Sequence, residues 1–201
     1  MTIESSQHNL DATRCFGNGS PIYESYHDEE WGVPIHDDRH LFELLILEGA
    51  QAGLSWETIL KRRETYRLAF DNFDIQTVAN YGAAKIENLL QYEGIIRNKL
   101  KVNAAIKNAK TVLKIQKEHG SLDSYLWAFV YGAPLQPDWE SMSEVPSETA
   151  ISTNLSKELK KRGMSFVGPT IIQAYMQSSG MTNDHQTTCP RHQACKDLSE
   201  T

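Results

Sequence analysis

The chain has 201 residues, of which 40% are hydrophobic, and a formal net charge of -6. A chain of this size can bury one substantial core, and it contains no apolar run near the ~18 residues that a membrane span requires. The first 14 residues lack the apolar stretch of a signal peptide. We therefore expect a cytoplasmic protein of one domain, or of two closely packed lobes, with no membrane partner.

The net charge hides an uneven distribution along the chain. Residues 1–50 carry ten acidic and two basic side chains, whereas residues 85–117 carry eight basic and two acidic ones. The basic segment is compatible with a solvated face on amphipathic helices and with a nucleic-acid surface, which the net negative charge would otherwise disfavour. Charge alone favours the solvated face.

Residues 1–13 are polar and without periodicity, which predicts a disordered tail. From Asp37 onward the pattern is helical, and no run alternates as a sheet would require. The Pro-, Ser- and Glu-rich segment 132–150 is the expected connection between lobes. Side chains that can cap helices are Asp37, Ser55, Asp74 and Ser121. Helices are expected at 38–52, 56–70, after Asp74, at 83–91, after the break at 92–99 until Gly120, at 122–132, and in 156–163 and 168–180. The expected fold class is all-α.

Glu48 stands where the helix at 38–52 needs an apolar residue. It follows Leu41 by seven positions and Leu44 by four, so its carboxylate projects from the stripe that faces the core. A buried, unpaired carboxylate costs on the order of several kcal/mol. Two explanations fit: an internal salt bridge or helix-end position at the edge of the stripe, or a pocket acid that receives a cationic or hydrogen-bond-donating ligand.

Aromatic residues flank Glu48 in the sequence. Trp56 follows within eight residues, past a segment whose two glycines permit a sharp turn, and Tyr23, Tyr26 and Trp31 precede it. An acid among aromatic faces is suited to a flat, positively charged ligand, which the acid attracts by charge and the rings by cation–π contact. These neighbours favour the pocket explanation.

Two pairs of Cys and His residues stand near opposite ends of the chain. His185 and Cys189 are four positions apart, and Cys15 and His27 lie in the N-terminal segment. Four such ligands can form a closed zinc site, which is structural because no coordination position remains for a reactive water. The spacing is also compatible with free thiols and a surface histidine. Cys195 is left as a free thiol or an alternate ligand.

Six stretches, taken in order, resemble the 3-methyladenine DNA glycosylase I family across nearly everything after residue 13. They read YHDEEWGVP, LFELLILEGAQAGLSWETILKRRE, GIIRNKLK, LSKELKKRG, FVGPTI and NDH, the last shortly before Cys189. The resemblance implies an all-helical, helix-hairpin-helix glycosylase domain at 14–192, with disordered tails at 1–13 and 193–201. It also implies that a structural zinc ion joins the two ends of this domain, bound by Cys15, His27, His185 and Cys189.

The resemblance assigns roles to the acid and the aromatic residues. It implies that Glu48 is the catalytic, base-binding acid and that Trp56 and Tyr26 line the base pocket, where Tyr23 and Trp31 are expected as further aromatic contacts. Some relatives have a tryptophan two residues after the first cysteine. This chain instead reads Cys-Phe-Gly and is one residue shorter before the first histidine, so Phe16 is expected to take over the stacking role.

The resemblance also implies a DNA-binding hairpin at EGIIRNK, although only Gly94 is present of the double glycine of other superfamily members. Backbone N–H groups after Gly94 are expected to bind phosphates, assisted by Arg97, Lys99 and Lys101. Leu54 is expected either as a wedge that fills the space of a flipped base or as a core residue.

Together these features predict a monomeric, monofunctional repair enzyme that excises 3-methyladenine from double-stranded DNA by hydrolysing the N-glycosidic bond. Methylation at N3 makes the base cationic and a better leaving group, so the enzyme must mainly extrude the nucleotide and hold the base against Glu48 and the rings. Two other interpretations stay open. One is a zinc-stabilised DNA- or protein-binding module without activity, which Phe16 and the shortened first loop favour. The other is a hydrolase with zinc at its reaction centre.

Overall fold

The computed structural model describes residues 14–198, so the tail predicted at 1–13 lies outside the described residues. Within them the chain forms helices and connections, with one isolated bridge between Leu135 and Thr182 and no named strand. The all-α prediction is confirmed for this part of the chain. The helices are α1 (Pro21–Glu29), α2 (Asp38–Gln51), α3 (Trp56–Leu60), α4 (Arg63–Ala69), η1 (Asp71–Phe73), α5 (Ile75–Ala79), α6 (Ala83–Gln91), α7 (Lys99–His119), α8 (Leu122–Trp127), η2 (Ala128–Val130), α9 (Ala150–Lys161), α10 (Pro169–Ser178) and α11 (Pro190–Leu198).

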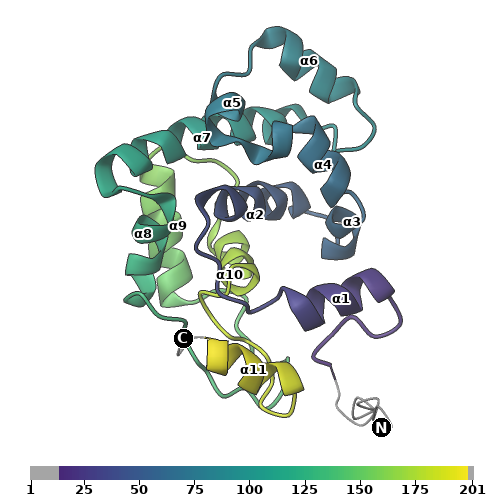
Figure 1. Cartoon of the computed structure of the whole chain (residues 1–201), viewed down its shortest axis with the longest axis vertical. Coiled ribbons are helices and arrows are strands. Elements are labelled where there is room, and N and C mark those ends of the chain that lie inside the picture. The colour runs from purple at the N-terminus through teal and green to yellow at the C-terminus, as the bar shows by residue number, and fades with distance from the viewer. Residues whose placement is uncertain (1–13, 199–201) are drawn as a thin grey trace, which may run out of the picture.

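Helices α2 and α10 lie in the middle of the molecule, as Figure 1 shows, with α4 to α7 above them, α8 and α9 on the left, and α1 and α11 below. Helix α10 packs against both α2 and α9, and α5 packs against α7. Every residue of α2 from Leu41 to Ala50 is buried, because neighbouring helices surround it. A polar side chain in this stretch therefore has little access to bulk water.

The four predicted helix caps are confirmed. The side chains of Asp37, Ser55, Asp74 and Ser121 each accept a hydrogen bond from the backbone N–H three residues later. The single helix predicted at 56–70 is wrong, because α3 ends at Leu60 and α4 begins at Arg63. The Arg62 amide bonds to the Ile59 carbonyl, three residues back, and this tighter turn separates the two helices.

Two helices near the ends of the described chain were not predicted. Helix α1 buries only Tyr26 and His27, and α11 buries only His192 and Cys195. Neither has the wide apolar stripe from which an amphipathic helix is recognised. The disordered tail predicted at 193–201 is therefore wrong for 193–198, which belong to α11; residues 199–201 lie outside the described part.

Helices α6 and α7 are joined by residues 92–98 and form a helix–turn–helix unit at one end of the molecule. At Gly94 an added Cβ would lie 2.7 Å from the Thr65 Cβ, so the turn packs too closely against α4 for a larger residue. The side chain of Asn98 caps α7 by accepting hydrogen bonds from the Leu100 and Lys101 amides. The close packing at Gly94 and the Asn98 cap together fix the conformation of this turn.

The segment between η2 and α9 packs against the chain that precedes α11. The Leu135 amide donates to the Met181 carbonyl at 3.0 Å, and the Thr187 amide donates to the Trp139 carbonyl at 2.9 Å. These contacts make the segment part of the core structure, and it brings Met142 to the pocket described below.

Between residues 14 and 198, no helix has the length and apolar character needed to cross a lipid bilayer.

Candidate functional site

Glu48 is buried near the C-terminal end of α2, with 3% of its surface exposed. Among the described residues no cation pairs with it. Burial raises the pKa of its carboxyl to about 8, although a hydrogen bond with the Ser178 side chain lowers this pKa in part. The internal salt bridge considered from the sequence is therefore not formed. At neutral pH, therefore, Glu48 without a neighbouring cation is mainly protonated and uncharged.

The carboxyl of Glu48 lies in the wall of a pocket of about 300 Å³, a volume at the lower end of those typical for small-ligand sites. The pocket brings together the acid and every aromatic residue predicted to bind substrate. These are Phe16, Tyr23, Tyr26, Trp31 and Trp56. Sequence reasoning missed the remaining lining residues, which are Gln51, Met142, Ala174 and Gln177.

The rings of the pocket contact one another and form a continuous aromatic surface. The centroid of Phe16 lies 4.9 Å from that of Tyr23 and 4.8 Å from that of Trp31, and the centroids of Tyr26 and Trp56 are 5.5 Å apart. Burial raises the pKa of the Tyr26 phenol well above its usual range, with the Glu48 charge as the second cause, so this hydroxyl stays a hydrogen-bond donor.

Trp56 opens α3 directly after the Ser55 cap, and 7% of its surface is exposed. Its indole Nε1–H is buried without a hydrogen-bond partner among the described residues. A buried, unpaired donor costs about 1–3 kcal/mol. The pocket therefore contains both an acid without a cation and a donor without an acceptor, which is the state expected of a site that awaits a ligand.

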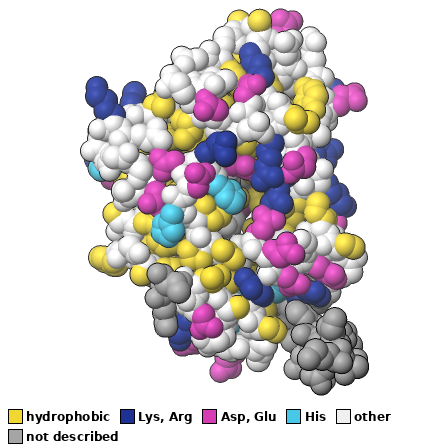
Figure 2. Space-filling view, viewed as in Figure 1, with side chains coloured by type: hydrophobic (Ala, Val, Ile, Leu, Met, Phe, Trp, Pro, Cys, Tyr) yellow, Lys and Arg dark blue, Asp and Glu magenta, His cyan; other side chains and the backbone are white. Residues whose placement is uncertain are grey.

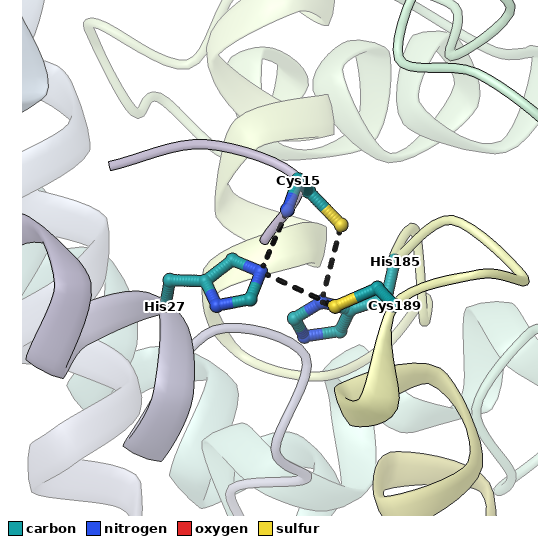
Figure 3. Close-up of side chains that lie close together, drawn as sticks. All are labelled: Cys15, His27, His185 and Cys189. Carbon is teal, nitrogen blue, oxygen red and sulfur yellow. Dashed lines mark hydrogen bonds between the residues drawn. The ribbon is translucent and has the colours of Figure 1, made fainter. Parts of the chain in front are cut away.

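The four predicted metal ligands lie together, as Figure 3 shows. The possible ligand atoms of Cys15, His27, His185 and Cys189 are all within 4.8 Å of one another. The Cys189 sulfur lies 3.6 Å from both His27 Nε2 and His185 Nδ1, and the Cys15 sulfur lies 3.6 Å from His185 Nδ1. Two sulfurs and two imidazole nitrogens that converge in this way can hold a metal ion.

The other ring nitrogen of each histidine has its own partner. His27 Nδ1 lies 2.8 Å from Asp28 Oδ1, and the guanidinium of Arg14 binds the same carboxylate and lowers its pKa. His185 Nε2 lies 2.9 Å from the Trp31 carbonyl oxygen. Such contacts fix the tautomer and the orientation of a ligating histidine. They leave His27 Nε2 and His185 Nδ1 to face the centre of the cluster, which supports the fit of a metal there.

The thiols of the cluster differ in their surroundings. The contact between the two sulfurs lowers the pKa of Cys189, to which His185 and His27 also contribute, and raises the pKa of Cys15, so Cys189 is the first of the pair to form the thiolate that a metal binds. Cys195 is buried beside the cluster, with its sulfur 3.9 Å from the Trp31 carbonyl, but it does not belong to the converging group.

The cluster and the pocket are built from the same short segments. Phe16, which lines the pocket, follows the ligand Cys15, and Tyr26, which also lines the pocket, precedes the ligand His27. Trp31 contributes its ring to the pocket and its carbonyl oxygen to His185. A bond across the cluster would therefore hold one wall of the pocket in place.

The predicted DNA-binding residues lie around the α6–α7 turn and the α2–α3 turn. The side chain of Arg97 is 51% exposed, and among the residues that the structure describes it has only a long contact of 3.8 Å with Glu93. Lys99 is exposed at the first position of α7. Leu54 is 41% exposed, so the alternative of a core leucine is wrong.

Lys101 differs from the other predicted DNA contacts. Its Nζ donates to the backbone carbonyls of Ala50 and Ala52, each at 2.8 Å, and desolvation lowers its pKa. The structure therefore gives Lys101 a contact that ties the end of α2 to the start of α7, which the sequence prediction did not include. On the face displayed in Figure 2, basic and acidic side chains are interspersed and do not separate into regions of one sign.

The family of the chain follows from comparison with known proteins. A family model described as methyladenine glycosylase matches residues 16–192. The DNA-3-methyladenine glycosylase of Haemophilus influenzae is 45% identical over 179 residues, which cover 89% of this chain and 97% of that protein. DNA-3-methyladenine glycosylase 1 of Escherichia coli is 46% identical over 169 residues, which cover 84% of this chain and 90% of that protein.

Solved structures agree with these matches. A crystal structure of 3-methyladenine DNA glycosylase I has a TM-score of 0.86 at 45% identity, and the match covers 89% of this chain and 98% of that one. A variant of a 3-methyladenine DNA glycosylase I in complex with 3-methyladenine has a TM-score of 0.86 at 37% identity, with coverage of 88% and 95%. The chain therefore belongs to the methyladenine glycosylase family, whose enzymes are hydrolases that act on N-glycosyl bonds.

Proposed function

We propose that this enzyme extrudes 3-methyladenine from alkylated double-stranded DNA and hydrolyses its N-glycosidic bond, without cleaving the DNA strand. The observation that carries this proposal is the buried Glu48 carboxyl, which has no cation of its own and lies among aromatic rings. The complex of a related glycosylase with 3-methyladenine supports the same ligand class.

The raised pKa of Glu48 gives a physical basis for selecting the damaged base. A cationic base that enters the pocket stabilises the carboxylate, so Glu48 releases its proton to solvent on binding. Neutral adenine supplies no such stabilisation and leaves the acid protonated. With the methylated base bound, the Glu48 carboxylate balances the positive charge of the base and accepts a hydrogen bond from its exocyclic amine.

The aromatic rings complete the recognition of the base. Trp56 and Tyr26 offer ring faces for stacking, and cation–π attraction contributes about 1–2 kcal/mol where the site is desolvated. Because the methylated base is already a good leaving group, a water molecule that attacks the sugar needs less activation than with a normal nucleoside. Residues 94–120 contain no Asp that could serve as a general base, and the proposal assigns none.

We propose that the DNA is held by a helix-hairpin-helix element formed by α6 and α7. Gly94 permits the close packing of the turn, and Arg97 and Lys99 are exposed beside it for contact with phosphates. Leu54, exposed on the α2–α3 turn, is suited to fill the space that the extruded nucleotide leaves. The Lys101 contacts with α2 would keep this turn close to the hairpin.

We further propose that Cys15, His27, His185 and Cys189 hold one Zn²⁺ ion. When bound, the ion would supply a cross-link between the two ends of the domain. Its four protein ligands would fill the coordination sphere, as is typical of structural zinc. The pocket acid is not among these ligands, which argues against the hydrolase with zinc at its reaction centre. We also expect the enzyme to act in the cytoplasm as a monomer.

The decisive experiment is the release of free base from DNA methylated to contain 3-methyladenine, followed by chromatography, with no metal added. We expect release well above the spontaneous rate. A folded sample that binds this DNA but releases no base above that rate would contradict the proposal and favour the non-catalytic DNA-binding module.

A further inference from the structure

Two glutamines of α10, Gln173 and Gln177, lie four residues apart and bind the same buried acid. Their Nε2 atoms lie 3.2 Å and 2.7 Å, respectively, from Asp184 Oδ2. The other carboxylate oxygen of Asp184 accepts hydrogen bonds from Trp139 Nε1 at 3.1 Å and Thr182 Oγ1 at 2.8 Å. Each glutamine thus turns its amide nitrogen towards Asp184.

The oxygen atoms of the two amides have different surroundings. Gln173 Oε1 accepts a hydrogen bond from Thr149 Oγ1 at 2.9 Å, and Gln173 is buried away from the pocket. Gln177 lines the pocket, and within residues 14–198 its Oε1 has no hydrogen-bond partner. Because Nε2 is held by Asp184, Oε1 points away from that acid. Gln177 thus lines the pocket that contains Glu48, and its amide oxygen has a fixed orientation relative to Asp184.

We propose that Gln177 is a specificity-determining residue that accepts a hydrogen bond from the exocyclic amine of the extruded base, and that Asp184 is the positioning residue that fixes its amide. This inference rests on the proposed function. An exocyclic amine has two N–H groups, so Glu48 and Gln177 can each accept one. A base with a carbonyl oxygen at this position would place that oxygen against the amide oxygen of Gln177, which cannot donate, and would bind more weakly.

The test uses two free bases with the same ring and methyl group. The first is 3-methyladenine; the second is 3-methylhypoxanthine, in which an oxygen replaces the amine. Binding is measured by titration calorimetry for the wild type, Gln177→Met and Gln173→Met. Both substitutions remove one hydrogen bond to Asp184 from the same helix, but only the first removes an acceptor from the pocket.

We expect Gln177→Met to weaken 3-methyladenine binding about tenfold and to leave 3-methylhypoxanthine binding unchanged or slightly tighter. Gln173→Met should keep the wild-type ratio of the two affinities even if its melting temperature falls. Asp184→Asn should reduce the ratio by a smaller factor, because the amide of Gln177 can then rotate.

The outcomes separate this inference from the proposed function. A wild type that binds 3-methyladenine and releases it from alkylated DNA, combined with equal affinity ratios in the two glutamine variants, overturns the role of Gln177 alone. A folded wild type that neither binds the free base nor releases it from DNA overturns the proposed function and this inference with it.

Discussion

The base pocket and the Cys/His cluster share the segments around Cys15 and His27, but they differ in whether their polar groups have partners. In the cluster, each histidine nitrogen that faces away from the centre has a partner at 2.8 or 2.9 Å. In the pocket, the Glu48 carboxyl has no cation, and the Trp56 Nε1–H has no acceptor among the described residues. The cluster has the features of a group that stabilises the fold, and the pocket those of a group that reduces stability for the sake of a ligand.

The same contrast appears between two acids of one helix. Glu43 and Glu48 are both buried in α2, with 7% and 3% of their surfaces exposed. Glu43 forms an ion pair with Arg67 at 2.8 Å, whereas Glu48 has no such partner between residues 14 and 198. Burial alone therefore does not identify a functional acid; the absence of a structural partner does.

The largest expected effect comes from exchanging these two acids separately for their amides. Glu48→Gln should reduce excision of 3-methyladenine by ~100-fold or more, because the charge that balances the cationic base is lost. Glu43→Gln should leave excision close to the wild-type rate but lower the melting temperature, since it leaves Arg67 without its buried partner. Excision rates and thermal melts of both variants measure this. Equal loss of activity in the two would remove the distinction between the acids.

Removing a ligand of the cluster should have a large effect on stability. Cys189→Ser should lower the free energy of unfolding by about 3 kcal/mol and abolish zinc binding, because metal binding contributes to folding. Cys195→Ser, a change at a buried cysteine outside the cluster, is the matched control and should retain the metal. Metal content is read by mass spectrometry and stability by denaturant titration. Excision per folded molecule should be unchanged in Cys195→Ser and only reduced in Cys189→Ser, because the pocket wall beside Cys15 and His27 loses its cross-link while Glu48 and the rings remain. Complete loss in a folded, zinc-free sample with an intact pocket would place zinc in the reaction.

The pH dependence of stability should show the cost of the pocket acid. The folded-state pKa of Glu48 is about 8, against 4.5 for the free side chain, so the folded state binds the proton more tightly than the unfolded state does. Its stabilising contribution is present at low pH and is lost as pH rises towards and through 8. Between pH 6 and pH 8.5 the wild type should lose about 2 kcal/mol relative to Glu48→Gln. Parallel stability curves for the two proteins would contradict the raised pKa.

The smallest expected effect concerns the contact with phosphates. Arg97→Ala should weaken binding of undamaged DNA about threefold and reduce the slope of log affinity against log salt by about 1. Lys117→Ala, in the last turn of α7 and far from the α6–α7 turn, is the control and should change neither quantity. An equal effect of both substitutions would mean that general charge, rather than the hairpin, attracts the DNA.

The sequence was sufficient to locate the acid and the cluster but not the whole pocket. Glu48 could be identified because a charged residue interrupts an apolar stripe, and the cluster because the chain has only three cysteines, each in a segment that also contains a histidine. Met142 and Gln177 lie about 90 or more residues from Glu48 in the chain, and nothing in their local pattern indicates a pocket. Their positions depend on how α10 and the segment before α9 pack.

The errors have a common physical origin. Helices α1 and α11 each bury only two residues, which is too few for periodicity to reveal them. The carbonyl contacts of Lys101 were not foreseen either, because it stands in a basic segment from which only a phosphate contact was predicted, and that prediction is untested. Composition does not distinguish these uses, whereas tertiary packing does.

The central claim is that Glu48 selects a base for its positive charge. Its most direct test compares two stable ligands that cannot react, the cation 3,9-dimethyladeninium and neutral 9-methyladenine, by titrating each into the protein from pH 6 to pH 9. The account predicts that the cation binds more tightly, that its affinity rises with pH until about pH 8 as Glu48 ionises, and that Glu48→Gln abolishes both effects. Equal affinity for the two ligands, or a preference for the cation that is independent of pH and persists in Glu48→Gln, would contradict it.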